Sequence, residues 1–237
     1  MNLNKRLNIA TIAGMAAIAC APAAFAQEVT LDFEGLENRE GVEAYYGGGA
    51  GSLGSSGPDH GVIFAPEAMA LIDTDAGGTG NIANEPSPDT VLAWASGPSL
   101  VMNVPNGFSS RFAFYYSASA SATVTLYDGV DGTGSVVDTV TLQAQHNDSC
   151  TGDPDGDFCN WNFVSVNFTG VVRSVDFSGT ADLVGFDDIT LGAANNASAP
   201  VSIPSMSPIG LLLLSGGLGL VGLAASTAAR RSPDRRR

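Results

Sequence analysis

The chain has almost no positive charge away from its two ends. Of its ten Lys and Arg residues, only Arg39, Arg111 and Arg173 lie between Gln27 and Pro200, whereas 23 of the 24 acidic residues lie there. Contacts to nucleic-acid phosphates require Lys and Arg, so this composition excludes a nucleic-acid partner. The acidic surface has two interpretations: it keeps an exported protein soluble, or its clustered carboxylates bind cations.

The sequence also lacks the motifs of common enzymes. It has only two histidines, His60 and His146, and no Gly-x-Ser-x-Gly elbow, Walker loop or His-Glu-x-x-His motif. A glycosidase needs only two carboxylates, which a chain this acidic can supply, but no motif marks such a pair. We therefore expect a protein that is not an enzyme.

Sustained helical periodicity is absent between Gln27 and Ala194. Short alternating runs predict strands instead, beginning at Val29–Phe33 and ending at Phe186–Leu191. The other predicted strands are Gly61–Ala65, Met69–Ile72, Val91–Ala95, Arg111–Ser117, Ala122–Tyr127, Val136–Leu142, Ser165–Gly170 and Ser174–Gly179. Residues 27–194 are predicted to form one all-β domain, an antiparallel β-sandwich of about nine to eleven strands.

Two loop predictions accompany these strands. The sequence Asp-Gly-Val-Asp-Gly at 128–132 separates Ala122–Tyr127 from Val136–Leu142 and predicts a hairpin. The Gly- and Ser-rich stretch Gly47–Gly57 cannot form the interior of a strand. Turn residues therefore separate the strands throughout the domain.

Residues 1–26 have the three parts of a secretory signal peptide. These are a basic start at Lys5 and Arg6, an apolar segment over Leu7–Ala21, and a cleavage site of small residues at Ala24 and Ala26 before Gln27. The sequence therefore predicts export through the inner membrane, into a compartment that permits disulfides.

An apolar segment near the other end, Ile209–Ala229, is long enough to cross a hydrocarbon core of roughly 30 Å as a helix. Five arginines follow it and favour the cytoplasmic side: Arg230, Arg231, Arg235, Arg236 and Arg237. On hydropathy alone, this segment predicts a C-terminal transmembrane anchor.

A short motif precedes the span, formed by Ile203, Pro204, Ser205, Met206, Ser207 and Gly210. Together with the span and the arginines, it resembles IPTL-CTERM sorting signals, relatives of PEP-CTERM, although Pro208 and Ile209 replace the Glu and Trp of that pattern. The resemblance implies an exosortase-type transpeptidase as a partner, which cleaves near the motif. Residues 203–237 would then be a transient anchor in the inner membrane, preceded by a linker over 195–202. The processed protein would reach the cell surface, outer membrane or extracellular matrix.

Only two cysteines, Cys150 and Cys159, remain after the signal peptide. An even pair nine positions apart in an exported protein predicts a disulfide that closes a loop. That loop contains Asp153, Asp155 and Asp157, whose spacing is similar to the start of a calcium loop. The twelfth position is Val164 and not Glu, which excludes an EF-hand and leaves a solvated acidic turn as the alternative.

The ends of the domain also carry a resemblance. Asp32-Phe33-Glu34-Gly35 and Phe186-Asp187-Asp188-Ile189 resemble segments of jelly-roll carbohydrate-binding modules, in which first and last strands are neighbours and hold a structural calcium ion. The resemblance implies Glu34 with Asp187 or Asp188 as ligands. The alternative is that these are acidic surface positions at strand ends.

Most of the domain is similar to β-rich surface proteins sorted by exosortases. The shared segments are Asp32–Leu36, Phe112–Tyr116 and Gly170–Ile189.

Exposed aromatic rings can stack on sugars, and Tyr45, Tyr46 and Trp94 are the candidates, with a core position as the alternative for each. We expect a non-catalytic binder of exopolysaccharide, or alternatively a structural or adhesion protein of the matrix that binds proteins or itself.

Overall fold

The computed structural model describes residues 28–147, 150–151, 153 and 155–192, which belong to one compact unit, Met1–Ala197. The predicted signal peptide, linker and sorting signal, including the span Ile209–Ala229, lie outside the described residues. Their predictions therefore stay predictions. In the described ranges, no helix has the length and apolar character of a membrane span.

The described residues form strands and no helix, and every strand pair is antiparallel. The strands are β1 (Val29–Leu31), β2 (Ile63–Phe64), β3 (Met69–Ile72), β4 (Thr90–Ala93), β5 (Ser99–Phe108), β6 (Arg111–Ala118), β7 (Ala122–Tyr127), β8 (Val136–Leu142), β9 (Asn162–Asn167), β10 (Val172–Ser178) and β11 (Val184–Leu191).

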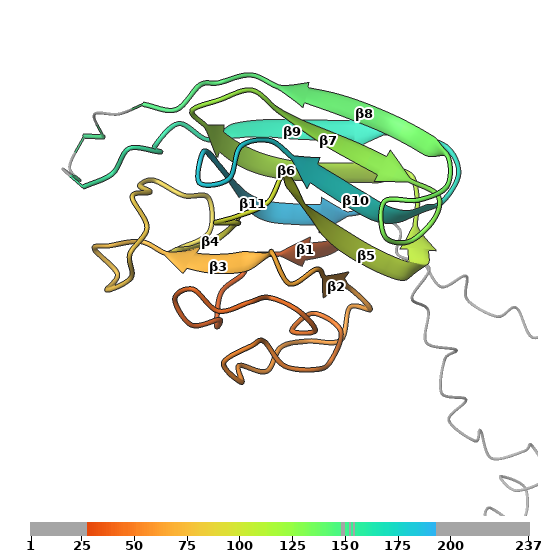
Figure 1. Cartoon of the computed structure of the whole chain (residues 1–237), viewed down its shortest axis with the longest axis horizontal. Coiled ribbons are helices and arrows are strands. Elements are labelled where there is room, and N and C mark those ends of the chain that lie inside the picture. The colour runs from red at the N-terminus through yellow and green to blue at the C-terminus, as the bar shows by residue number, and fades with distance from the viewer. Residues whose placement is uncertain (1–27, 148–149, 152, 154, 193–237) are drawn as a thin grey trace, which may run out of the picture. The chain divides into compact units, whose positions relative to one another are not determined.

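These strands make two sheets (Figure 1). The first sheet has the order β3-β4-β11-β6-β9, with β1 also paired to β11; the second has the order β2-β5-β10-β7-β8. The predicted antiparallel β-sandwich is confirmed, as is the hairpin of β7 and β8. The first and last strands are neighbours, with Val29 opposite Leu191 and Leu31 opposite Ile189.

Aromatic rings from both sheets fill the core between them. The alternation in β6 buries Phe112 and Phe114, and Phe177 of β10 lies 6.2 and 6.4 Å from their ring centroids. Phe177 also meets Phe186 of β11 at 4.7 Å, so rings of the first and second sheets interdigitate. Such pairs contribute about 0.5–1.5 kcal/mol each beyond the area that they bury.

The sequence reasoning missed β5, because Pro105, Asn106 and Gly107 end its alternating pattern. Gly107 has a positive φ of 78°, and the register of β5 with β10 shifts between Val172 and Ser174. A bulge of this kind lets the strand continue past residues that would otherwise end it.

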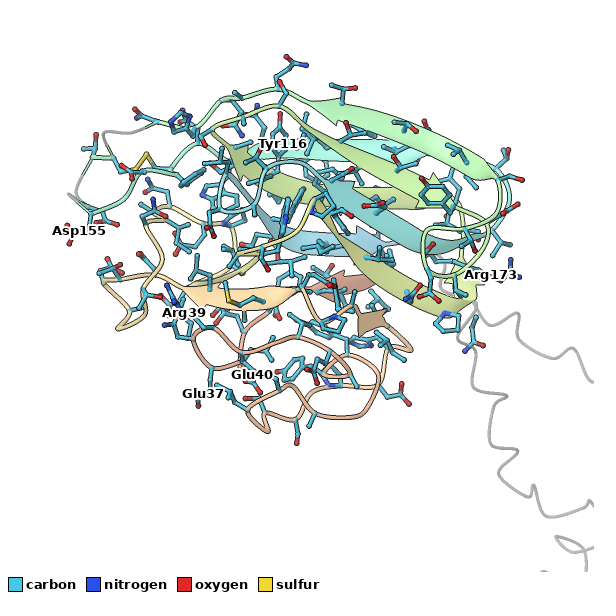
Figure 2. All side chains as sticks on the ribbon, viewed as in Figure 1. Glu37, Arg39, Glu40, Tyr116, Asp155 and Arg173 are labelled. Atoms are coloured by element: carbon cyan, nitrogen blue, oxygen red, sulfur yellow. A yellow bond between two sulfur atoms is a disulfide. The ribbon has the colours of Figure 1, made fainter. Side chains whose placement is uncertain are left out.

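The long connection between β1 and β2 contains no strand, as predicted for Gly47–Gly57. It is organised by a buried carboxylate, Glu40, which Figure 2 labels within this connection. The Glu40 carboxylate accepts hydrogen bonds from the backbone N–H groups of Glu37, Leu53 and Ser55 at 2.8–3.0 Å, and from Ser55 Oγ at 2.5 Å. Burial acts to raise the pKa of Glu40, but these hydrogen bonds outweigh it and lower the pKa.

A second, smaller apolar cluster lies on the outer face of the first sheet, which is the face opposite the core. Its buried members are Ile82, Val91 and Phe158, against which Leu71 and Trp161 pack. Ile82 and Phe158 come from two connections that are joined by a backbone bridge. Part of this outer face is therefore covered by the two connections that carry Ile82 and Phe158, and the rest is open. The candidate site lies at the boundary between these two parts.

Candidate functional site

The three aromatics predicted to stack on sugar, Tyr45, Tyr46 and Trp94, are buried in the core. Tyr46 Oη accepts a hydrogen bond from the Phe33 N–H at 2.6 Å, and Tyr45 Oη donates one to the Glu34 carbonyl at 2.8 Å. The Trp94 ring stacks on a core phenylalanine. Burial removes the exposed ring faces that sugar stacking requires, so that prediction is corrected: these are core residues.

The aromatic ring exposed on the outer face of the first sheet belongs to Phe163, which the sequence reasoning did not select. Its side chain is 51% exposed, and its ring centroid lies 5.0 Å from that of Tyr115. The two are cross-strand partners in β9 and β6. We call Tyr115, Phe163 and Arg111 the aromatic platform.

Arg111 gives the platform a charged rim. Its guanidinium carbon lies 5.9 Å from the Phe163 ring centroid. The same guanidinium donates to Glu28 Oε1 at 2.7 Å and to Ser165 Oγ at 3.1 Å. Held on two sides, Arg111 keeps a fixed position beside the exposed ring, where its remaining N–H groups can donate to a ligand.

Trp161 links the platform to the covered part of the face. It precedes Phe163 by two residues and therefore points to the same side of the sheet. Its Nε1 donates to the Ala83 carbonyl at 3.0 Å, and its ring passes 3.4 Å from where a Cβ on Gly185 would stand. The Trp161 ring therefore packs close to β11 at Gly185.

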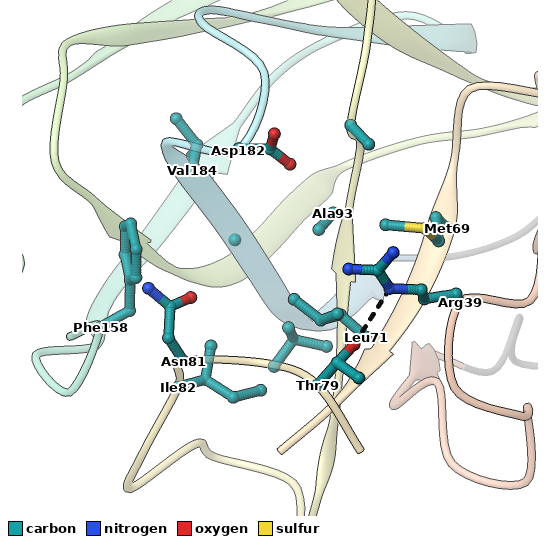
Figure 3. A pocket seen from close by; sticks show the side chains of 13 residues that line it. Arg39, Met69, Leu71, Thr79, Asn81, Ile82, Ala93, Phe158, Asp182 and Val184 are labelled. Atoms are coloured by element: carbon teal, nitrogen blue, oxygen red, sulfur yellow. Dashed lines mark hydrogen bonds between the residues drawn. The ribbon is translucent and has the colours of Figure 1, made fainter. Parts of the chain in front are cut away.

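Gly185 also lines a cavity of about 400 Å³ over β3, β4 and β11 (Figure 3). Its apolar lining includes Met69, Leu71 and Ala93, and its polar lining includes the four side chains Arg39, Thr79, Asn81 and Asp182. Arg39 Nε donates to Thr79 Oγ1 at 3.0 Å. An apolar floor with a few convergent polar groups is typical of small-molecule sites, whose volumes run from about 300 to 1,000 Å³.

The predicted calcium ligands Glu34 and Asp187 do meet, around Ser87. The Ser87 N–H and Oγ donate to the two carboxylate oxygens of Asp187 at 2.8 Å each. Glu34 accepts from the backbone N–H groups of Asp89 and Thr90 at 3.0 and 2.9 Å, and from Thr90 Oγ1 at 3.3 Å. The loop 87–90 therefore occupies the oxygens of both carboxylates.

Burial dominates the electrostatics of this pair. Asp187 is fully buried, and burial raises its pKa to about 7 despite the hydrogen bonds from Ser87. Burial and the charges of Asp32 and Glu34 also raise the pKa of Asp188, which has a positive φ of 46°. Calcium binding by Glu34, Asp187 and Asp188 stays a prediction. The hydrogen bonds of Glu34 and Asp187 show a different role for these two residues, which is to hold the loop 87–90.

The predicted disulfide of Cys150 and Cys159 is confirmed, with Cα atoms 5.8 Å apart. The loop that it closes does not gather its three aspartates around one point. Asp153 Oδ1 accepts from the Asp155 N–H at 3.0 Å, and Asp157 accepts from Asn81 Nδ2 at 2.9 Å. Figure 2 shows Asp155 at the tip of the loop.

No protein-family model and no curated protein matches the sequence. Among solved structures, a variant of the family 29 carbohydrate-binding module CBM29-2 is 10% identical with a TM-score of 0.37, over 74% of this chain and 98% of that one. TmCBM61 in complex with β-1,4-galactotriose is 12% identical with a TM-score of 0.35, over 67% and 99%. CsCBM6-3 from Clostridium stercorarium in complex with cellobiose is 13% identical with a TM-score of 0.34, over 54% and 83%. Likenesses with TM-scores of 0.37 and below give no information on what this chain binds.

Proposed function

We propose that the β-sandwich is a non-catalytic carbohydrate-binding domain whose ligand lies on the outer face of the first sheet. The observation that carries the proposal is the exposed Phe163 ring beside Tyr115. A large ring left open to water is unusual in a chain that buries Phe112, Phe114 and Phe177 completely. The apolar C–H face of a pyranose packs well on such a ring, and the free N–H groups of Arg111 can donate hydrogen bonds to the sugar hydroxyls.

The neighbouring cavity extends this surface. Gly185 lines the cavity and contacts Trp161, which lies on the same side of the sheet as Phe163. A chain of several sugar units bound on the platform can therefore place an end unit near the polar side chains of the cavity, among them Asn81 and Asp182. This arrangement favours an oligosaccharide over a single sugar as the ligand.

Binding accounts for the site better than catalysis does. Glycoside hydrolysis requires two carboxyl groups on either side of the scissile bond, one of them with a raised pKa. The pKa of Asp187 is raised to about 7, but its side chain is fully buried beneath Ser87 and cannot touch a sugar. On the platform itself, Glu28 is the carboxylate, and it is paired with Arg111.

The biological setting that we propose comes from the chain ends. The chain is exported, held by Ile209–Ala229, released near Ile203–Ser207 by an exosortase-type transpeptidase, and then binds exopolysaccharide outside the cell. Mass spectrometry of the protein recovered from the cell surface tests this setting. A mature form that begins at Gln27 and ends before Ile209 is expected, whereas a surface form that retains Arg237 would refute processing.

Glycan-array binding by the purified full chain tests the carbohydrate proposal. Phe163→Ala and Tyr115→Ala are each expected to weaken binding about tenfold, which corresponds to about 1.4 kcal/mol of stacking. Leu53→Ala is the matched control, because Leu53 is an exposed apolar residue in the β1–β2 connection. Unchanged binding by Phe163→Ala would exclude the platform. Self-association without any glycan signal would instead favour the matrix or adhesion alternative.

A further inference from the structure

Three carboxylates from two distant parts of the chain converge at one end of β3. Asp73 directly follows this strand, Asp75 lies in the turn after it, and Asp153 belongs to the disulfide loop. Each offers one carboxylate oxygen, and the three oxygens all lie within 4.8 Å of one another. None of the three belongs to the Glu34 and Asp187 pair described above.

The cluster contains buried oxygens that no protein group satisfies. Asp73 is only 5% exposed, and its Oδ1 is buried without a hydrogen-bond partner. Oδ2 of Asp153 is likewise buried and unpartnered, since the hydrogen bond from the Asp155 N–H goes to Oδ1. A buried carboxylate oxygen without a donor is costly, so these two atoms point to a missing partner.

The described part of the chain does not supply a cation there. Arg39 donates to Thr79, Arg111 to Glu28 and Ser165, and Arg173 to the Asp128 carbonyl. The described residues therefore leave these three carboxylates without a counter-charge.

We propose that Asp73, Asp75 and Asp153 form a calcium-binding site. Calcium is bound by oxygen ligands at about 2.3–2.6 Å, so oxygens on opposite sides of the ion can be about 4.6–5.2 Å apart. The three oxygens lie within 4.8 Å of one another, close enough for one calcium ion to contact all of them. Magnesium keeps most of its water and is seldom held by protein carboxylates alone, so calcium is the better match.

The bound ion joins β3 to the disulfide loop. At Gly156, a Cβ would stand 3.0 Å from Asp153 Oδ2 and 3.1 Å from Cys150 Sγ, so the carboxylate and the disulfide both lie against this glycine. The same two connections carry Ile82 and Phe158 of the second apolar cluster. Calcium therefore fastens the covered part of the outer face, a structural role that does not rest on carbohydrate binding.

Calorimetry and thermal unfolding of the full chain, purified in detergent with its disulfide intact and freed of metal by a chelator, test the site. Calcium chloride is expected to bind with heat exchange and to raise the melting temperature by about 5–10 °C at a hundredfold excess over the dissociation constant. No heat and no shift for the wild-type chain would overturn the proposal and indicate that Asp73 and Asp75 share a proton instead.

Variants locate the ion. Asp73→Asn is expected to raise the melting temperature without calcium, because it removes repulsion, and to weaken calcium binding about tenfold or more. Asp155→Asn is the matched control, since this exposed neighbour stands outside the cluster, and it should bind calcium as the wild type does. Loss of binding in Glu34→Gln together with unchanged binding in Asp73→Asn would move the ion to the other carboxylates and refute this site.

Discussion

At the scale of single residues, a few buried polar groups hold the connections in place. Glu40 is the clearest case, because one carboxylate satisfies three backbone N–H groups and one hydroxyl across residues 37–55. Backbone donors in a loop have no strand partner, so a side chain must take that place. The Glu40 carboxylate thus supplies this connection with the hydrogen-bond acceptors that a neighbouring strand would supply in a sheet.

Glu40→Ala is therefore expected to lower the free energy of unfolding by about 2–4 kcal/mol, since it leaves several buried donors without an acceptor. Denaturant unfolding measures the change. Glu37→Ala is the control: this exposed side chain should change stability by no more than about 0.5 kcal/mol. An effect of Glu40→Ala as small as that of the control would show that water replaces the carboxylate without cost.

Residue patterns predicted burial in the strands well but could not do so in the irregular connections. The alternation in Arg111–Ser117 correctly places Phe112, Phe114 and Tyr116 on the core face. Tyr45 and Tyr46 lie in an irregular connection, where no period indicates which way a ring points. The sequence does contain a signal for Phe163, because Val164, Val166 and Phe168 alternate on one face and place Phe163 on the opposite one.

At the scale of elements, the disulfide loop and the connection from Asp73 to Asp89 cover part of the first sheet. They hold each other through backbone hydrogen bonds from Ala83 to Phe158 and from Asp157 and Phe158 to Asn81. The covalent link between Cys150 and Cys159 restricts the loop in the unfolded chain as well. We therefore expect that the disulfide loop can unfold locally while the main core stays folded.

Replacing both Cys150 and Cys159 by Ala is expected to lower the free energy of unfolding by about 2–3 kcal/mol, the loop-closure value for a loop of this length. Hydrogen exchange should show faster exchange in residues 155–161, with unchanged protection of the core strands β6 and β10. A reductant should destabilise the wild-type chain and leave the variant unaffected. Equal loss of protection in all of these segments would mean that the loop is part of the main cooperative unit.

Strand-level prediction succeeded where turns are local and failed where pairing overrides the local signal. The hairpin at 128–132 and the final strand near Phe186–Leu191 follow directly from turn residues and alternation. β5 was missed because its Pro105 and Gly107 are breakers, which pairing with β10 and a bulge accommodate. Asp73 and Asp153 are 80 positions apart in the sequence, so their convergence depends on the tertiary fold and no local pattern indicates it.

At the scale of the whole molecule, several of the many carboxyl groups are buried, and this makes stability depend on pH. The pKa values of Asp73, Glu85 and Asp187 are raised to about 6, 7 and 7, chiefly by burial, whereas unfolded carboxyls titrate near pH 4. The folded state then binds more protons than the unfolded state between about pH 4 and 7. Stability must therefore fall as the pH rises through this window.

Without calcium, the free energy of unfolding is expected to be at least about 2 kcal/mol higher at pH 5 than at pH 7.5. Asp73→Asn should reduce this difference, whereas Asp155→Asn should leave it unchanged. Glu40 acts in the opposite sense but only at lower pH, because its lowered pKa means that its contribution is lost as the pH falls through that value. Stability that rises from pH 5 to 7.5 in chelator would contradict the buried, unneutralised carboxylates described above.

The central claim is that the outer face of the first sheet binds carbohydrate at Tyr115 and Phe163. Amide chemical-shift mapping tests it most directly: the full chain is titrated with an oligosaccharide that binds on the array. We predict that the largest shifts fall on Arg111, Tyr115 and Phe163, with smaller ones at the cavity residues Asn81 and Gly185. Shifts confined to the second sheet or to the β1–β2 connection, with none at Tyr115 and Phe163, would contradict the account.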